Sequence, residues 1–346
     1  MIHPTLDASA PSDHPATAFG KVGVMLVNLG TPDAPEAKAV KRYLREFLSD
    51  KRVVDYPRLV WLPVLHGIIL NVRPRKTAAL YAKIWHRESG KSPLAYFTER
   101  QAEGVKARLS PALIVRHAMR YGSPSIDDRL REMTAEGCDR ILIVPLYPQY
   151  SATTTATVMD KVSACMSEMA WQPALRSLPP FYDDPSYLDA LEGSVRRALP
   201  EGAERIILSY HGIPERYFAQ GDPYHCHCQK TSRLLRERMG WSPNFAPIGF
   251  QSKFGPEKWL DPSTESLVIR AAKDGIKRLA VIAPAFVSDC LETLEEVAIG
   301  LAETFEEHGG EVLTAIPCLN DDPQFLDSLA QMIERELGGW EPAATS

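Results

Sequence analysis

The sequence lacks the features by which exported and membrane-spanning proteins are recognised. Its first 20 residues contain no lysine or arginine and no apolar run, which excludes a secretory signal peptide. The longest apolar stretch, residues 59–72, has 14 residues and is interrupted by Pro63, His66 and Asn71. A spanning helix needs roughly 20 apolar residues, so this stretch does not predict one. We therefore expect a cytoplasmic protein whose residues 1–20 form a disordered tail.

Basic blocks and clustered cysteines are also missing. The net charge of −5 and the absence of a basic run argue against a nucleic-acid partner. The six cysteines are scattered, with only Cys226 and Cys228 close together and none after Cys318. A [2Fe–2S] cluster normally takes four ligands, so we expect neither a cluster nor another tightly bound cofactor. The adjacent ligands in residues 225–228 do not readily form a tetrahedron, and a loop without metal is favoured there over a zinc site.

Nucleotide-binding loops are absent as well. No expected strand is followed by a G-x-G-x-x-G or G-x-x-x-x-G-K-[ST] sequence, which places a nucleotide-binding protein last among the alternatives. Instead, expected strands and helices alternate along the chain: short apolar runs rich in β-branched residues are each followed by a helical pattern. Such alternation predicts parallel sheets with helices on both faces. The expected strands are residues 22–28, 113–119, 140–146, 205–210, 278–284 and 311–316.

The two halves of the chain resemble each other. Residues 26–32 (LVNLGTP) and 208–214 (LSYHGIP) place leucine, glycine and proline at the same offsets. Gly137 and Gly275 each lead into a strand that is followed by proline, an aromatic residue and serine. Chance similarity between strand-turn sequences is the alternative, but two related doubly wound domains are the simplest account. Ligands of such sheets bind beyond the carboxyl ends of the strands, so the cleft between the domains is the expected site.

The repeat also predicts where the domains divide and where one carries an insertion. We expect a first domain over residues 21–185 and a second over 186–346. The spacing from Gly30 to Gly137 exceeds that between the matching glycines of the second half by 44 residues. The extra segment falls at about residues 50–100, which include the apolar stretch. We therefore interpret it as an apolar lip beside the cleft.

Two segments just beyond strand ends carry residues suited to proton or metal chemistry. His211 follows the strand at 205–210 and precedes a glycine and a proline that turn the chain. Histidine titrates near neutral pH and can accept a proton there. Glu292 and Glu296 are four residues apart on one face of an expected helix, where repulsion raises the proton affinity of one of them. A loop-capping histidine and an acidic first helical turn are the structural alternatives.

These segments resemble the signatures of one enzyme family. SYHGIPERYFAQGDPY and FVSDCLETLEE are similar to the two ferrochelatase signatures, and NLGTP, RYGSP, YPQYSATTT and FQSKFGPEKWL match the family in the same order. The resemblance implies a bacterial-type enzyme, a lyase of haem biosynthesis, that inserts its substrate Fe²⁺ into protoporphyrin IX. It also implies an α/β fold of two flavodoxin-like, chelatase-type domains, each a parallel sheet flanked by helices, in agreement with the repeat.

The resemblance further implies roles for individual residues. His211 corresponds to the family histidine that serves as metal ligand or as base for pyrrole protons, and Glu292 to the carboxylate opposite it. Glu296 and Asp289 correspond to further members of an acidic track for metal or protons. The family often has histidine where this chain has Cys290, which weakens a proton-relay or metal role at that position. The implied porphyrin pocket contains Arg120, Tyr121, Trp259, Tyr147 and Asn28.

The implied substrate sets further expectations. Arg120, Arg73 and Arg75 are candidates to bind the propionate arms of the ring. Iron is expected to approach one face of a bent ring while protons leave from the other, with His211 and Glu292 dividing these duties. A chelatase for coproporphyrin or sirohydrochlorin and a non-catalytic haem or metal carrier are the alternatives. The apolar lip favours a ring with few charges and a transient contact with the inner face of the membrane.

Overall fold

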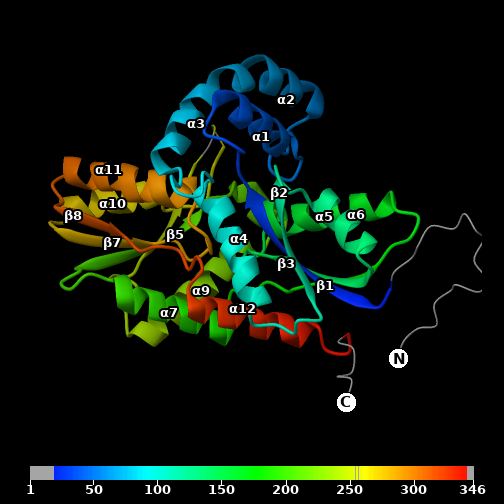
Figure 1. The fold of residues 1–346 in the computed structure, drawn as a ribbon. Coiled ribbons are helices and arrows are strands. Elements are labelled where there is room, and N and C mark those ends of the chain that lie inside the picture. The colour runs from blue at the N-terminus through cyan, green and yellow to red at the C-terminus, as the bar shows by residue number, and fades with distance from the viewer. Residues whose placement is uncertain (1–18, 254, 256, 341–346) are drawn as a thin grey trace, which may run out of the picture.

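A computed structural model describes residues 19–253, 255 and 257–340 as two four-stranded parallel sheets flanked by helices (Figure 1). The sheets have matching strand orders, β2-β1-β3-β4 and β6-β5-β7-β8. This order confirms the predicted α/β fold with two similar halves. The strands are β1 (Lys21–Gly30), β2 (Ile114–Tyr121), β3 (Cys138–Pro145), β4 (Ala174–Ser177), β5 (Arg205–His211), β6 (Ile248–Gln251), β7 (Arg278–Ile282) and β8 (Val312–Ala315).

Six of these strands coincide with the predicted ones, whereas β4 and β6 were not predicted. Each has only four residues, ALRS and IGFQ, which is too short for a periodic pattern to emerge from the sequence. In the first sheet, β1 pairs with β2 so that Gly30 lies opposite Tyr121. In the second, β5 pairs with β6 so that His211 lies opposite Gln251. The carboxyl ends of corresponding strands therefore carry Gly30 and His211.

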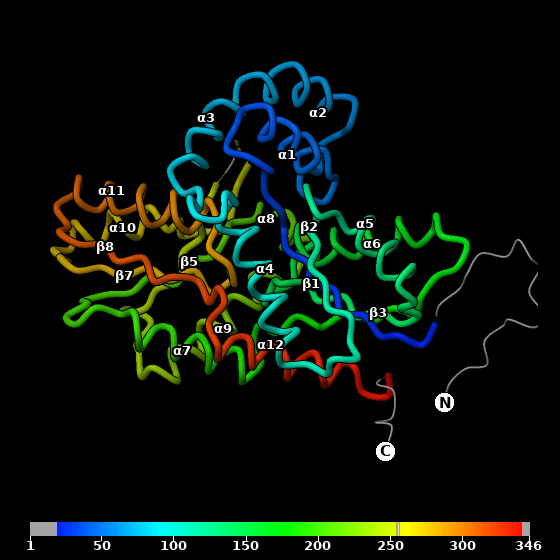
Figure 2. The backbone as a smooth tube through the Cα atoms, in the orientation of Figure 1, coloured from blue at the N-terminus to red at the C-terminus, as the bar shows by residue number. Residues whose placement is uncertain are grey.

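Four helical segments of the first half form a separate layer above both sheets (Figures 1 and 2). They are α1 (Ala37–Ser49), α2 (Arg58–Val64), the π-helical segment η2 (Leu65–Ile69) and α3 (Leu70–Ile84), and they share a core of their own. The next helix, α4 (Pro93–Lys106), returns to pack on β2. From here on, the lip denotes residues 37–84; the predicted insertion, at about residues 50–100, overlaps this layer but omits α1 and runs on into α4. No helix within the described part of the chain is both long and apolar enough to cross a membrane.

The remaining helices cover the faces of the two sheets. Those of the first half after α4 are α5 (Ile126–Ala135), η3 (Ala152–Ala156) and α6 (Thr157–Ser167). Those of the second half are α7 (Pro185–Ala198), α8 (Glu215–Ala219), α9 (Tyr224–Met239), α10 (Thr264–Lys273), η4 (Glu292–Leu301), α11 (Ala302–Glu307) and α12 (Pro323–Glu336).

The last helix, α12, links the two halves on the side away from the lip. It packs on both α4 and α7 (Figure 1). Beyond it, the carbonyl of Trp340 accepts from Arg140 Nη1 of β3 at 2.8 Å. One buried core runs from Leu26 of β1 to Leu208 of β5. The two halves thus share packing beneath the cleft, and the division at residues 185 and 186 stays a prediction.

The predicted N-terminal tail falls mostly outside the described residues, which begin at Phe19. Two residues of the predicted tail are nevertheless held in place. Phe19 packs edge-on against Trp171, and Gly20 donates its backbone N–H to Asp139 at 3.1 Å.

Candidate active site

A cavity of about 870 Å³ lies between the lip and the carboxyl ends of the two sheets. This size is in the range of about 300–1,000 Å³ typical of small-molecule sites. Its wall combines aromatic and aliphatic side chains from both halves with a smaller set of charged ones, among them Arg73, Arg216, Lys253 and several glutamates. Such a wall suits a flat apolar ligand, because aromatic side chains bury large areas against a planar face. Aromatic members of the wall include Tyr43, Phe47, Trp61, Tyr147, Trp259 and Phe286.

His211 is the last residue of β5 and part of the cavity wall. Its Nδ1 lies 2.6 Å from the carbonyl oxygen of Gly212. Because a carbonyl can only accept, Nδ1 carries a hydrogen, and in the neutral imidazole Nε2 is then the nitrogen with the lone pair. The strand end thus presents an imidazole whose Nε2 can take a proton or bind a metal.

Gln251, which the sequence did not single out, connects the His211 and Glu292 segments. It is 3% exposed at the end of β6. Its carbonyl accepts from Gly212 N at 2.8 Å, and its Nε2 donates to the carbonyl of Glu292 at 3.0 Å. These bonds fix the position of Glu292 relative to the end of β5. The signal available in the sequence was the FQSKFGPEKWL motif, which matched the family without giving Gln251 a role.

Glu292 begins η4, which is π-helical where the sequence predicted an ordinary helix. π-Helical turns are rare and occur frequently at functional sites. Glu292 and Glu296 both line the cavity. Burial raises the pKa of Glu296, and the charge of Glu292 adds to the rise, while hydrogen bonds from Ser252 and the proximity of His211 oppose it. The predicted increase in proton affinity is therefore confirmed for Glu296, with burial as its main cause.

Glu296 also accepts hydrogen bonds from the turn after β6, a structural role that the predicted acidic track did not include. Its two oxygens accept from Ser252 N at 2.8 Å and from Ser252 Oγ at 2.6 Å. Ser252 has φ +63°, a left-handed conformation that is strained for a residue other than glycine. The carboxylate of Glu296 thus holds the turn that follows β6.

Asp289 does not belong to the cavity wall among the described residues, contrary to its predicted place in an acidic track. It is buried, and its oxygens accept from Thr293 Oγ1 at 2.9 Å, Asn320 Nδ2 at 2.6 Å and Cys318 N at 3.3 Å. It therefore anchors the loop that leads to Glu292. Cys290 does line the cavity, and burial raises the pKa of its thiol well above the usual value.

Arg120 and Tyr121, predicted for the porphyrin pocket, are absent from the described wall of the cavity. Arg120 pairs with Asp50 at 2.5 Å and donates to the Thr157 carbonyl at 2.9 Å. The Tyr121 hydroxyl donates to the same Asp50 oxygen at 2.8 Å. The Arg120 guanidinium is thus paired with a mostly buried carboxylate, and its place in the porphyrin pocket stays a prediction.

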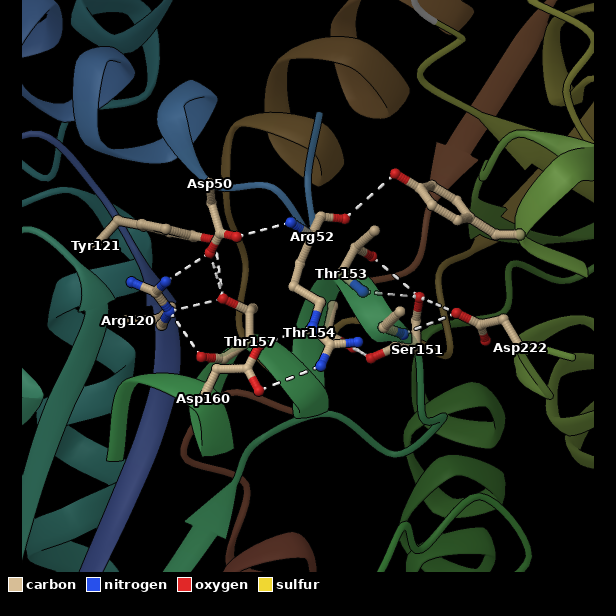
Figure 3. A network of polar contacts seen from close by, with 12 residues as sticks. Asp50, Arg52, Arg120, Tyr121, Ser151, Thr153, Thr154, Thr157, Asp160 and Asp222 are labelled. Atoms are coloured by element: carbon tan, nitrogen blue, oxygen red, sulfur yellow. Dashed lines mark hydrogen bonds and ion pairs between the residues drawn. The ribbon is translucent and has the colours of Figure 1, made fainter. Parts of the chain in front are cut away.

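Asp50 begins a segment, residues 50–56, that connects α1 to α2 and contributes to the cavity wall. Arg52 in this segment makes two bonds to Asp160, at 2.7 and 3.2 Å, and its carbonyl accepts from the Tyr217 hydroxyl at 3.3 Å (Figure 3). Arg216 donates to Asp55 at 2.8 Å. The base of the lip is thus attached to the first sheet at one end and to α8 of the second half at the other.

Three other predicted pocket residues do line the cavity: Asn28, Tyr147 and Trp259. Asn28 is buried, and its Nδ2 donates to Thr98 Oγ1 at 2.9 Å and to Ser288 Oγ at 3.4 Å, so it bridges the two halves. The Tyr147 hydroxyl and Trp259 Nε1 are buried without a hydrogen-bond partner among the described residues. Both atoms are therefore available to a polar group of a ligand or to water.

Among the three arginines considered for the propionates, the structure places Arg73 in the cavity wall. Burial lowers the pKa of its guanidinium. Arg75 lies on the same helix, α3, and both side chains are partly open to solvent, but Arg75 is not part of the described wall. Arg73 is therefore the member of the set that a bound ligand can reach.

Residues 225–228, predicted as a loop, instead form part of the first turns of α9. The helix begins because Asp222 accepts from Tyr224 N at 3.0 Å. His227 Nδ1 accepts from Tyr150 N at 3.2 Å, while Cys228 is buried and Cys226 exposed. Within the described ranges, no group of three or more His, Cys, Asp or Glu side chains is placed to hold a metal ion.

Comparison with known proteins bears on this cavity and its fold. Residues 21–337 match the family model described as ferrochelatase. The chain is 52% identical to the ferrochelatase of Rhizobium meliloti (strain 1021) over 96% of this chain and 99% of that one. It is 51% identical to the ferrochelatase of Agrobacterium fabrum (strain C58 / ATCC 33970) over 96% of this chain and 98% of that one.

A likeness to a solved structure supports the fold alone. SirB from Bacillus subtilis, solved with Fe³⁺, superposes with a TM-score of 0.55 at 13% identity, covering 93% of this chain and 99% of that chain. The two ferrochelatases, by contrast, share about half of their residues with this chain, and these matches extend over nearly its whole length. On these matches the chain belongs to the ferrochelatase family.

Proposed function

We propose that the chain inserts ferrous iron into protoporphyrin IX to form protohaem, the terminal step of haem biosynthesis. Apart from family membership, one observation on the cavity supports the proposal. His211, with a free Nε2, and Glu292 line the same largely apolar cavity, and Gln251 connects their backbones. A base, a carboxylate and an apolar cavity are what metal exchange against two pyrrole protons requires.

The chemistry must remove two N–H protons as Fe²⁺ enters, so the ring nitrogens end with no hydrogens and the metal with four nitrogen ligands. We infer that His211 and Glu292 act from opposite faces of the ring, one receiving protons and the other guiding the metal. Oxygen and single imidazole ligands hold Fe²⁺ weakly enough to release it. Contacts of the ring with the aromatic wall would supply the energy that bends it toward the metallated geometry.

The carboxylate arms of the ring need cationic or hydrogen-bonding partners in a cavity this apolar. Arg73 is the arginine among the three candidates that lies in the wall, and we assign it to a propionate. A charge-assisted bond between a guanidinium and a carboxylate is strong and often bidentate. Arg120 is not assigned to this role because Asp50 already neutralises it.

The proposal is tested by anaerobic metallation with protoporphyrin IX and coproporphyrin as alternative substrates. We expect many turnovers with protoporphyrin and clearly fewer with coproporphyrin, because the exposed surface of the cavity is largely apolar and two further carboxylates would have to be buried against it. Faster turnover of coproporphyrin would reassign the substrate. Stoichiometric binding of haem or iron without turnover would favour the carrier instead.

The lip is proposed to touch the inner face of the cytoplasmic membrane, from which a poorly soluble ring can enter. Four of its apolar side chains project into solvent, with exposed fractions of 91% for Leu59, 63% for Val60, 61% for Ile68 and 57% for Val72. Trp61, in the same stretch, is instead buried and donates Nε1 to the Leu48 carbonyl at 2.7 Å. Leu59 and Val60, rather than Trp61, are therefore the side chains with which to test membrane contact.

Replacing Leu59 and Val60 together with aspartate is expected to lower the fraction of protein that floats with anionic liposomes about tenfold or more. Each apolar side chain contributes about 1.5 kcal/mol or more when buried in the lipid interface. Flotation of the Val312→Asp variant provides the control, because Val312 is an exposed apolar residue on β8, outside the lip. Equal flotation of all three proteins would show that the lip does not bind membranes.

A further inference from the structure

A buried chain of hydrogen bonds runs behind the cavity wall from α10 to the backbone of Glu292. Thr264 Oγ1 lies 2.8 Å from Ser209 Oγ, which in turn lies 2.6 Å from Oε1 of Gln251. At the other end of the same amide, Nε2 donates to the carbonyl oxygen of Glu292 at 3.0 Å. Thr264 and Ser209 are completely buried. Ser209 is not part of the described cavity wall, so it can act on a ligand only through its neighbours.

The count of hydrogens gives this chain of bonds one direction. A carboxamide oxygen can only accept, so the single hydrogen of the Ser209 hydroxyl is donated to Gln251. The Ser209 oxygen must then accept from the Thr264 hydroxyl, because it has no second hydrogen to donate. The amide of Gln251 is thereby held with its oxygen toward Ser209 and its NH2 group toward the Glu292 carbonyl. The opposite orientation would set two oxygens that only accept against each other.

The second sheet places these side chains on one face. β5 and β6 pair in parallel with Ser209 opposite Gly249, and two residues further on His211 lies opposite Gln251. Side chains of paired residues, and of residues two apart on one strand, lie on the same face of a sheet. A Cβ atom on Gly249 would lie 2.8 Å from Thr264 Oγ1. The glycine therefore leaves the space in which Thr264 reaches Ser209.

Gln251 holds the two reactive segments by different parts of its structure. Its backbone carbonyl accepts from Gly212 N at 2.8 Å, so the His211 segment is held whatever side chain residue 251 carries. The Glu292 segment, in contrast, is held by the side-chain amide. Because η4 begins at Glu292, this bond acts on the turn that carries the Glu292 carboxylate. A change of side chain at residue 251 should therefore disturb Glu292 while His211 stays in place.

We propose that Gln251 is a positioning residue for iron insertion, which Ser209 and Thr264 hold in the orientation that aligns the Glu292 carboxylate with His211 across the ring. The proposal rests on the proposed function, since it concerns the alignment of two groups assigned to that reaction. A misplacement of about 1 Å can cost about a hundredfold in rate, even when the substituted residue is away from the chemistry. Porphyrin binding should change little, because the aromatic wall is untouched.

The first test separates rate from affinity. Gln251→Leu keeps a similar volume and removes the amide, and we expect kcat for insertion of Fe²⁺ into protoporphyrin IX to fall about a hundredfold, with the porphyrin KM within about threefold. Ser209→Ala should lower kcat about tenfold, the effect of one lost hydrogen bond. Gln172→Leu, which removes an exposed amide that donates to the Met166 carbonyl, is the matched control and should leave kcat unchanged. An unchanged kcat in Gln251→Leu, or a rise in KM alone, would overturn the proposal.

A double-mutant cycle shows whether Gln251 acts through Glu292. Residues that act as a unit have strongly non-additive effects on rate. In a Glu292→Gln background, Gln251→Leu should therefore change kcat by less than about threefold. A larger loss in that background would overturn the proposal, because Gln251 would then act by another route. If thermal melting shows that Gln251→Leu does not fold, Ser209→Ala takes its place in the same cycle with the same criterion.

Hydrogen exchange keeps this inference distinct from the proposed function. Backbone amides of peptides that cover η4, measured without porphyrin or metal, should exchange faster in Gln251→Leu because the first turn loses a bond. If the unmodified chain fails to metallate protoporphyrin IX, the proposed function is wrong, and faster exchange would still support the hold of Gln251 on the Glu292 segment. Equal exchange of the η4 peptides in the two proteins would overturn that hold.

Discussion

The His211→Ala variant is expected to lose at least about a thousandfold in the rate of iron insertion while porphyrin binding stays within about threefold. His211 carries the imidazole whose Nδ1 is committed to the Gly212 carbonyl, so Nε2 alone is free for protons or metal. Alanine removes that nitrogen and leaves the bonds of Gln251 to Gly212 and Glu292 in place, because neither bond involves the His211 side chain.

Porphyrin binding should persist because most of the cavity wall is untouched by this change. The ring is expected to contact the lip and the aromatic side chains, of which His211 is a small part. Anaerobic turnover with Fe²⁺ measures the chemistry, and porphyrin fluorescence measures binding. Glu303→Gln, on the exposed side of α11, serves as the control for loss of a polar group from the same region. Turnover of His211→Ala near that of the unmodified protein would remove His211 from the mechanism.

The fold was largely predictable from local sequence, and its exceptions have physical causes. Long apolar runs gave the central strands, and the repeated Leu-Gly-Pro spacing gave the two halves. The π-helical geometry of η4 was not predictable, because helical periodicity hardly distinguishes hydrogen bonds to the fourth residue from bonds to the fifth. The position of α12 beneath both sheets was likewise invisible, since an amphipathic helix does not reveal which surface it covers.

The sequence predicted site residues that stand in a distinctive motif at a strand end. It did not predict residues whose surroundings depend on a partner far away in the sequence. His211 and Glu292 were identified because each follows a strand end in a distinctive motif. Arg120 was expected to face the ligand, but its charge is taken by Asp50, which lies 70 residues away in sequence.

Asp50→Asn is expected to lower the free energy of unfolding by about 3 kcal/mol at neutral pH, because it breaks a mostly buried charge pair and leaves Arg120 uncompensated. The carboxylate accepts from Arg120, Tyr121, Thr157 and the backbone of Arg52, more bonds than the amide can replace (Figure 3). Urea unfolding monitored by circular dichroism measures the loss. Asp33→Asn, which breaks the exposed pair with Arg42, should cost less than about 1 kcal/mol.

The same pair predicts how this difference depends on pH. Burial alone would raise the pKa of Asp50, but hydrogen bonds from Thr157, Arg52 and Tyr121 and the charge of Arg120 lower it below the ordinary value of 3.8. A lowered folded-state pKa stabilises the protein fully above the unfolded-state value, about 3.9, and this stability is lost as the pH falls through the folded-state pKa. Unfolding free energies of Asp50→Asn and the unmodified chain should therefore differ at pH 7 and converge below about pH 4. A constant difference across this range would mean that hydrogen bonding or packing of the side chain, rather than its charge, holds the base of the lip.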